Sequence, residues 1–416
     1  MSTDNYLNRL VRRDWLTNSP LSNVVTSYIE KLRKDEYADR TILSYLGSLA
    51  HFSYWGKTEG VDLSSPDAVL VKQFLSCHLP SCHCPPPCYC AVASSGASLR
   101  HLLKVVPHEQ KACADDNPVT VELRQFADYL TNTCGLAPAT CDRRIHYVSA
   151  LLVREFGTQT PMIEHLSAAR LDAFFKELSA RLRPASLGVV RTSLRSYFRY
   201  RALQGEATAS LAAALPKIAS WRHATMPQAL SDSELEAFLM SFNRADPVGL
   251  RDYAMARCLV DLGMRGHEVT YLTMDSVNWR CGTITISSTK SKREQQLPLP
   301  ESTGEAIAQY LRLGRPQTVN RALFVRHRAP FDKPLGVAAI RSSMNRAFVR
   351  CGLRDRFCNT HVLRRTTATR LQRSGASVKE IADLLRHQSL DTAGTYARVD
   401  LERLRTVALP WPGRQS

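Results

Sequence analysis

A short alternating stretch in the last third of the chain constrains the fold more than any other feature. Residues 282–286 read Gly-Thr-Ile-Thr-Ile, the alternation of a half-buried strand. Residues 295–299 can pair with it across a turn rich in Ser and Lys, which predicts a β-hairpin. Helical patterns surround the hairpin, and Ser231 and Glu234 have the spacing of a capping box at a helix start. We therefore expect an α+β unit with a small antiparallel sheet over residues 229–416.

The rest of the chain divides into four regions by composition. The helical patterns of residues 28–32 and 126–130 match, and both are followed by a turn and an amphipathic helix. This match predicts that the first helical region duplicates the second, although chance similarity between amphipathic helices is the alternative. The predicted regions are a helical domain (1–75), an insert or linker rich in Cys, His and Pro (76–116), a helical domain (117–205) and a linker (206–228).

The chain is strongly basic, which favours a polyanionic partner. Its 416 residues include 55 Lys and Arg against 38 Asp and Glu, a net charge of +17. Cations placed on phosphates release condensed counterions, so nucleic acid is the expected partner, and general solubility is the alternative. No apolar run reaches the length of about 18 residues that a membrane helix needs, and the first residues lack a secretion signal. We therefore expect no membrane contact and a cytoplasmic protein, associated with the bacterial nucleoid when on DNA.

An arginine stripe marks the end of the second helical region. Residues 181–201 hold six arginines and no acidic residue. Arg191, Arg195 and Arg199 recur every four residues and share one face of a helix. Like charges at this spacing repel, so the helix is more stable when phosphates neutralise them. The stripe indicates a DNA-binding face, with a solvated basic face as the alternative.

The insert carries enough ligands for a zinc site. The chain has twelve cysteines, and five of them fall within 14 residues beside His78 and His83. The spacing is not the paired C-x-x-C form, so unligated thiols in a linker are the alternative reading. The candidate metal ligands are Cys77, Cys82, Cys84, Cys88 and Cys90.

The C-terminal unit contains the side chains that a metal-free reaction at a phosphodiester requires. Such a reaction needs two arginines on the non-bridging oxygens, a nucleophile, and a general acid for the leaving 5′ oxygen. Lys290 in the hairpin turn is the candidate general acid, and Lys292 in the same turn is the one alternative. The candidate catalytic residues are Arg265, Lys290, His361, Arg364, His387 and Tyr396.

These residues resemble the signature of the tyrosine recombinases, the phage integrase family. Residues 361–399 read HVLRRTTATRLQRSGASVKEIADLLRHQSLDTAGTYARV, with the tyrosine nine residues after the last histidine as in that family. The resemblance covers residues 229–405 well, and 117–205 in outline as the family's core-binding domain. Two positions depart from the family pattern: Arg386 replaces a glycine, and Arg365 stands where histidine is frequent. Arg386 adds charge that would contact DNA or distort the turn.

The resemblance implies a function and a role for each candidate. The chain would be a site-specific recombinase or integrase, of a transposon or plasmid type, that forms a 3′-phosphotyrosyl link without any required cofactor. Its partners would be double-stranded DNA and further copies in a tetramer, with partner recombinases in some systems. The implied roles are phosphate clamping by Arg265 and Arg364, acid catalysis by Lys290, proton transfer by His361, a phosphate hydrogen bond from His387, and nucleophilic attack by Tyr396.

Two other functions are compatible with the same residues. A non-catalytic DNA-binding subunit would keep the fold and support an active recombinase. A type IB topoisomerase would use similar chemistry without needing specific sites. All six candidate positions are filled, which favours the recombinase.

The arginine stripe can be tested by DNA binding. Replacing Arg191, Arg195 and Arg199 with Ala should weaken binding and flatten its dependence on salt, because fewer counterions are released. Titrations at several salt concentrations would measure both. An unchanged salt slope would contradict the contact.

Overall fold

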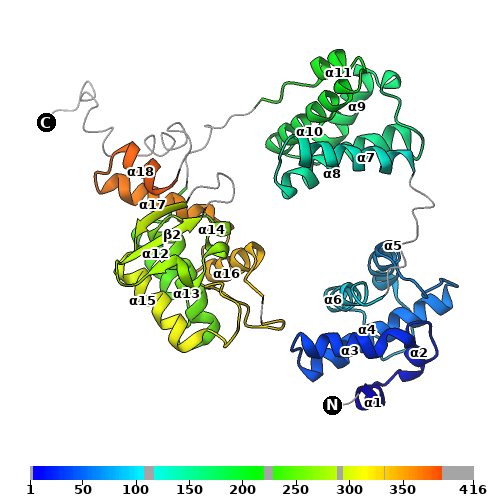
Figure 1. The fold of residues 1–416 in the computed structure, drawn as a ribbon, viewed down its shortest axis with the longest axis horizontal. Coiled ribbons are helices and arrows are strands. Elements are labelled where there is room, and N and C mark those ends of the chain that lie inside the picture. Colours follow the sequence, from blue (N-terminus) through cyan, green and yellow to red (C-terminus); the bar gives the residue numbers. More distant parts are fainter. Residues whose placement is uncertain (1–2, 107–116, 220–227, 288–293, 332, 387–416) are drawn as a thin grey trace, which may run out of the picture. The chain divides into compact units, whose positions relative to one another are not determined.

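The computed structural model describes the chain except for residues 1–2, 107–116, 220–227, 288–293, 332 and 387–416 (Figure 1). The described residues form three large hydrophobic cores, each built from one stretch of chain. These cores run from Tyr6 to Val106, from Val119 to Leu215 and from Leu230 to Leu363. Each stretch therefore forms a domain with its own core. Among the described residues, no helix is both long and apolar enough to cross a membrane.

The first domain is entirely helical. Its long helix α4 packs against α2 and α6, and its core includes the fully buried rings of Tyr6, Tyr28 and Phe52. A π-helical turn over Phe74–His78 follows α5. The helices are α1 (Thr3–Asn8), α2 (Arg13–Thr17), α3 (Ser22–Lys34), α4 (Asp39–Thr58), α5 (Ala68–Gln73) and α6 (Val92–Leu102).

Helix α6 corrects the predicted end of this domain. It lies inside residues 76–116, which we expected to be an insert or linker, yet Leu99 and Leu102 are fully buried in the first core. The hydroxyl of Tyr28 in α3 also donates to the Ser98 carbonyl over 3.1 Å. The two leucines lie three residues apart, on one helix face. Their apolar pattern closes the core although the surrounding composition is that of a linker.

The second domain is a separate helical unit. Helix α8 packs along α10, as α4 packs along α6 in the first domain. The duplication stays a prediction, but in both domains the longest or second-longest helix packs along a later helix in this way. The helices are α7 (Pro118–Asp128) with a π-helical turn (Tyr129–Thr133), α8 (Pro138–Phe156), α9 (Ala168–Ser179), α10 (Pro184–Leu203) and α11 (Ala209–Ala214).

A buried ion pair connects the first and last long helices of the second domain. Arg201 of α10 lies 2.7 Å from the carboxylate of Glu122 in α7. The Tyr197 hydroxyl donates to the same carboxylate over 3.0 Å, and Glu206 also contacts Arg201. The Arg201 side chain is therefore paired with acids inside the domain, whereas Arg195 and Arg199 on the same helix are exposed.

The third domain has the predicted α+β fold. The hairpin is confirmed: β2 pairs antiparallel with β3, with Ile284 opposite Leu297, and the short β1 completes the order β1-β2-β3. The predicted capping box at Ser231 is also present. The elements are α12 (Asp232–Met240), α13 (Pro247–Asp261), α14 (Gly266–Tyr271), β1 (Val277–Asn278), β2 (Thr283–Ser287), β3 (Glu294–Pro298), α15 (Glu301–Gln309), α16 (Val337–Arg350), α17 (His361–Arg373) and α18 (Val378–Leu384).

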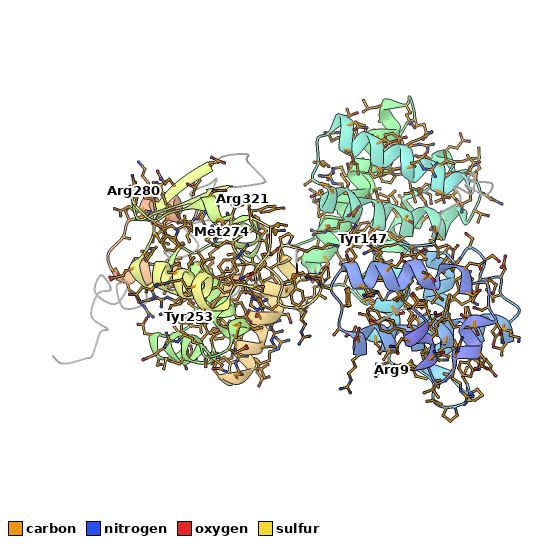
Figure 2. The ribbon with its side chains drawn as sticks, turned by 60° about the horizontal axis from the view of Figure 1, so that its bottom comes forward. Arg9, Tyr147, Tyr253, Met274, Arg280 and Arg321 are labelled. Carbon is orange, nitrogen blue, oxygen red and sulfur yellow. The ribbon has the colours of Figure 1, made fainter. Side chains whose placement is uncertain are left out.

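Helix α13 is the centre of this domain. It packs against α15, α16 and α17. Figure 2 labels Tyr253 of α13 and Met274, which both pack, partly buried, against the third core. Because α17 and the turn after α13 both depend on this helix, it positions residues that are far apart in the sequence.

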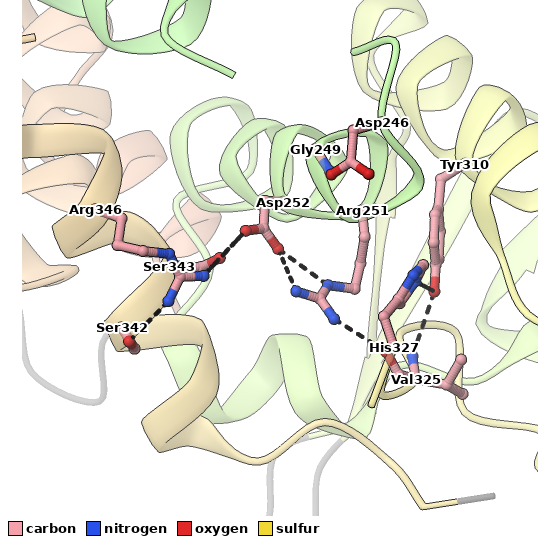
Figure 3. Close-up of polar contacts among 10 residues, drawn as sticks. All are labelled: Asp246, Gly249, Arg251, Asp252, Tyr310, Val325, His327, Ser342, Ser343 and Arg346. Atoms are coloured by element: carbon pink, nitrogen blue, oxygen red, sulfur yellow. Dashed lines mark hydrogen bonds and ion pairs between the residues drawn. The ribbon is translucent and has the colours of Figure 1, made fainter. Parts of the chain in front are cut away.

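A polar network holds α13 to its neighbours (Figure 3). Arg251 and Asp252 are both buried, and their side chains pair at 2.7 Å. The Asp252 carboxylate also accepts from Ser343 of α16 and lies 3.5 Å from Arg346. Arg251 donates in turn to the Val325 carbonyl over 3.4 Å. The charge of Asp252 is thus compensated within the domain.

His327 beside this network gives the domain a pH dependence. Burial and the nearby Arg251 lower the pKa of His327 to about 4. Its Nε2 atom lies 3.4 Å from the Tyr310 hydroxyl. An unfolded histidine titrates at about 6.5. As pH falls from about 6.5 towards 4, only the unfolded chain gains this proton, so folding stability decreases over that window.

We expect His327→Gln to reduce this loss. The variant should lose less unfolding free energy than the parent between pH 7 and pH 5, as measured by urea unfolding at both values. An identical pH difference in the parent and His327→Gln would contradict the role of the buried ring.

Candidate active site

The site is built on a tight turn after α13. Gly263 has φ +55°, and a Cβ there would come within 2.4 Å of the Leu385 side chain. Glycine is therefore required both for the left-handed backbone and for the close approach of Leu385. The turn places Arg265 immediately before the first residue of α14. The predicted catalytic arginine is thus held by backbone geometry.

A buried carboxylate holds Arg265 in place. Glu268 is only 1% exposed. It accepts from the Arg265 backbone N–H and from its guanidinium, each over 2.7 Å. Arg386 donates to the same carboxylate over 2.8 Å. Burial alone would raise the pKa of Glu268, but the Arg386 charge and the bonds from Arg265 outweigh it and lower the pKa. The carboxylate therefore stays charged between two arginines.

The second predicted arginine reaches the same turn from α17. Arg364 is 3% exposed, and its guanidinium donates to the carbonyls of Gly263 and Leu385. Arg265 also donates to the Arg386 carbonyl, over 3.4 Å. Arg265 and Arg364 thus both connect the turn at residues 263–265 with the backbone at residues 385–386. The Arg265 side chain remains 31% exposed, so it can still reach a ligand.

His361 is the first residue of α17, one helical turn before Arg364. Although His361 is exposed, desolvation by the surrounding protein lowers its pKa. The charges of Arg364, Arg365 and Arg265 lower the pKa further. The ring is therefore neutral at pH 7 and can accept a proton. The structure brings together three predicted residues, Arg265, His361 and Arg364.

The unusual Arg386 faces the protein interior. Its φ is +55°, a left-handed conformation that explains why glycine suits this position. The side chain is 5% exposed and bonded to Glu268, so its charge is used inside the protein, whereas the sequence had suggested either a DNA contact or a distorted turn. Arg386 also donates to the Leu384 carbonyl over 2.8 Å. The sequence signalled this residue by its departure from the family pattern, but not the direction of its side chain.

Three predicted catalytic residues, Lys290, His387 and Tyr396, lie outside the described residues. In the second domain, Arg195 and Arg199 are exposed on α10, and Arg191 is partly buried. Arg191 lines a hollow together with Arg143 and Arg144 of α8. Sequence reasoning missed Arg143 and Arg144, because they lie on α8, which packs along α10 but is distant from the stripe in the sequence.

The metal prediction is partly matched by a cluster in the first domain. Four of the five predicted cysteines, Cys82, Cys84, Cys88 and Cys90, lie near His51. The fifth, Cys77, is exposed and belongs to neither four-residue group. His51 was not predicted, because it lies 26 residues before the cysteine run begins.

Comparison with known proteins gives a consistent result. Residues 228–403 match the phage integrase family. The chain is 34% identical to a putative integrase/recombinase, y4rA, of Sinorhizobium fredii, over 88% of each protein. It is 28% identical to the tyrosine recombinase XerC of Pelobacter propionicus, over 70% of this chain and 94% of that one.

A solved structure has the same fold. The XerH site-specific recombinase, bound to its palindromic difH substrate after cleavage, superposes with a TM-score of 0.55. The alignment covers 70% of this chain and 88% of that one, at 20% identity. The mixed helical and antiparallel arrangement is therefore shared with an enzyme whose structure includes DNA.

The interior role of Arg386 can be tested with Arg386→Gly, which suits the left-handed backbone. We expect a net loss of stability of roughly 0.5–2 kcal/mol, because a hydrogen bond to a charged group contributes about 1.5–3 kcal/mol and relief at a left-handed residue offsets about 1 kcal/mol. Urea unfolding would measure this change.

Arg386→Gly should also move the acid side of the stability profile. Glu268 contributes stability that is complete above its unfolded pKa and is lost as pH falls through its lowered folded pKa. Removing Arg386 should raise that folded pKa, so stability should fall at a higher pH. An unchanged or increased stability at pH 7 would show that Glu268 does not need Arg386.

Proposed function

The chain belongs to the phage integrase family and is a tyrosine-type site-specific recombinase, and we propose that it cuts and rejoins DNA through a 3′-phosphotyrosyl intermediate. The observation that carries this proposal is the attachment of Arg265 and Arg364 to the turn around Gly263, with His361 one helical turn before Arg364 on α17. These residues come from stretches about 100 positions apart in the sequence. Two guanidinium groups beside a neutral imidazole suit a phosphodiester that is being attacked.

The proposed reaction is a pair of transesterifications. The Tyr396 oxygen attacks the scissile phosphorus while the bond to the 5′ oxygen breaks. His361 takes the phenol proton, and Lys290 supplies a proton to the 5′ oxygen. A 5′ hydroxyl from another strand then attacks the phosphotyrosine and releases Tyr396. The phosphoester bond is conserved, so the chemistry balances without a cofactor.

The cationic site would overcome two energetic barriers to this reaction. A free tyrosine has a pKa near 10, so about one in a thousand is ionised at pH 7. Arg265 and Arg364, with His387 as a hydrogen-bond donor, would stabilise both the phenolate and the crowded anionic transition state. Removing one such donor typically costs about 2.7–4 kcal/mol of barrier. Glu268 would keep Arg265 oriented without touching the phosphate.

Double-stranded DNA is the proposed partner, and the second helical domain is proposed to bind it. Exposed Arg195 and Arg199 on α10, with Arg143 and Arg144 on α8, would contact phosphates and fix the register of the duplex. Recombination between two duplexes requires four cleavages, which supports a tetramer, alone or with partner recombinases. The match to a putative integrase over most of both chains supports a role in moving a genetic element.

A suicide substrate would test the nucleophile. Nicked duplexes made from the DNA that flanks the coding region would trap the covalent intermediate, which migrates as a protein–DNA adduct in denaturing gels. We expect an adduct with the parent chain and none with Tyr396→Phe, because the variant lacks the attacking oxygen. Tyr271→Phe is the matched control, since Tyr271 is an exposed tyrosine of the same domain.

Each alternative gives a different result in this assay. An adduct with Tyr396→Phe would overturn the assignment of the nucleophile. A parent chain that binds these duplexes without forming an adduct would indicate an accessory subunit. Relaxation of supercoiled plasmids that lack the flanking sequences would indicate a topoisomerase.

A further inference from the structure

Six potential metal ligands gather at one place in the first domain. They come from the middle of α4, the turns after α5, and the loop that leads to α6. The side chains form two groups of four, and within each group the ligand atoms all lie within 4.8 Å of one another. The groups share His51 and Cys82, and the full set is His51, His78, Cys82, Cys84, Cys88 and Cys90.

The tautomer of His51 directs a lone pair at the cluster. Its Nδ1 atom lies 3.0 Å from the Tyr89 carbonyl oxygen, which can only accept a hydrogen bond. Nδ1 must therefore carry the proton, and Nε2 of the neutral ring is left as a ligand. A backbone carbonyl that orients a histidine in this way is the usual outer partner of a metal-bound imidazole. His51 is also fully buried on a long helix, so its position is rigid.

The spacing between ligand atoms is that of a tetrahedral zinc site. Zn–N and Zn–S bonds of about 2.05 and 2.3 Å give tetrahedral edges of about 3.3 Å between two nitrogens and about 3.6 Å between nitrogen and sulfur. The Nε2 atoms of His51 and His78 are 3.2 Å apart. Cys82 Sγ lies 3.3 Å from His51 Nε2, and Cys84 Sγ lies 3.5 Å from His78 Nε2.

We propose that the first domain binds one structural Zn²⁺ through His51, His78, Cys82 and Cys84. Two thiolates and two imidazoles at tetrahedral spacing select zinc among the common divalent ions. This set has three measured ligand–ligand distances that match a tetrahedron. In the other group, Cys88 and Cys90 take the places of His78 and Cys84. Their Sγ atoms are 3.3 Å apart, and Cys90 is exposed. Cys77 belongs to neither group, which revises the ligand set expected from the sequence.

The metal would fix an otherwise weakly supported part of the fold. Residues 82–91 contain no helix or strand, and they connect the turn after α5 to α6. Of the side chains in this stretch, most are exposed or only partly buried. A Zn²⁺ bound to α4, to the turn after α5 and to this loop would attach the loop, none of whose side chains is buried, to a helix whose middle lies in the hydrophobic core. Its removal should loosen the loop and the docking of α6.

Metal content of the purified full-length chain tests the proposal directly. Expression in zinc-supplemented medium should give about one zinc per chain by elemental analysis. The double variant C82S/C84S should lose it, with zinc content falling at least tenfold. C77S is the matched control, because this cysteine lies in the same segment outside the cluster, and it should retain full zinc content.

Two measurements on the unaltered chain make the result independent of variant folding. After removal of zinc with a chelator, added Co²⁺ should give the visible absorption of a tetrahedral thiolate complex. In the zinc-loaded chain, Cys82 and Cys84 should resist alkylation while Cys77 reacts, as located by mass spectrometry, and chelation should remove the difference.

The outcomes separate clearly. Absence of zinc in the parent chain together with no tetrahedral cobalt spectrum would overturn the site. Loss of zinc in C88S/C90S but not in C82S/C84S would overturn the assigned ligands. None of these measurements involves DNA, so the result does not depend on the recombinase mechanism.

Discussion

The arrangement of the third domain around Gly263 depends on one buried carboxylate. Glu268 is buried and bonded to both Arg265 and Arg386. Arg364 of α17 donates to the Gly263 carbonyl in the same turn. Three guanidinium groups this close would repel each other strongly in a medium of low dielectric constant. The negative charge of Glu268 offsets that repulsion, so cations can be concentrated before any phosphate arrives. The buried Glu268 carboxylate thus allows the arginines of the proposed phosphate site to lie close together.

Much of the fold followed from local patterns in the sequence. The hairpin was predicted from alternation in 282–286, and the start of α12 from the capping box at Ser231. Arg265, His361 and Arg364 were predicted because their spacing matches a known family; the structure attaches both arginines to the turn around Gly263, and the three catalytic roles stay predictions. These features are local, or are specified by motifs of a few residues, so one sequence is enough to recognise them.

The features that sequence reasoning missed depend on tertiary contacts. The direction of Arg386 is decided by a carboxylate more than 100 positions away, and its charge alone suggested DNA. His51 lies in an amphipathic helix where a buried histidine has no distinctive pattern. The apolar face of α6 was not recognised because a run of cysteines and prolines precedes it. Leu99 and Leu102 on that face pack in the first core. In each case the partner, and not the residue itself, determines the role.

The hydrogen bond from Arg364 to the Leu385 carbonyl has a mechanical consequence. It ties the guanidinium proposed to hold the phosphate to the backbone two residues before His387, from which the chain continues to Tyr396. The backbone at Leu385 cannot shift without disturbing a buried guanidinium. A displacement of the backbone at Leu385 would therefore also displace this guanidinium. The proposed phosphate contact and the chain that leads to the proposed nucleophile are thus coupled through one hydrogen bond.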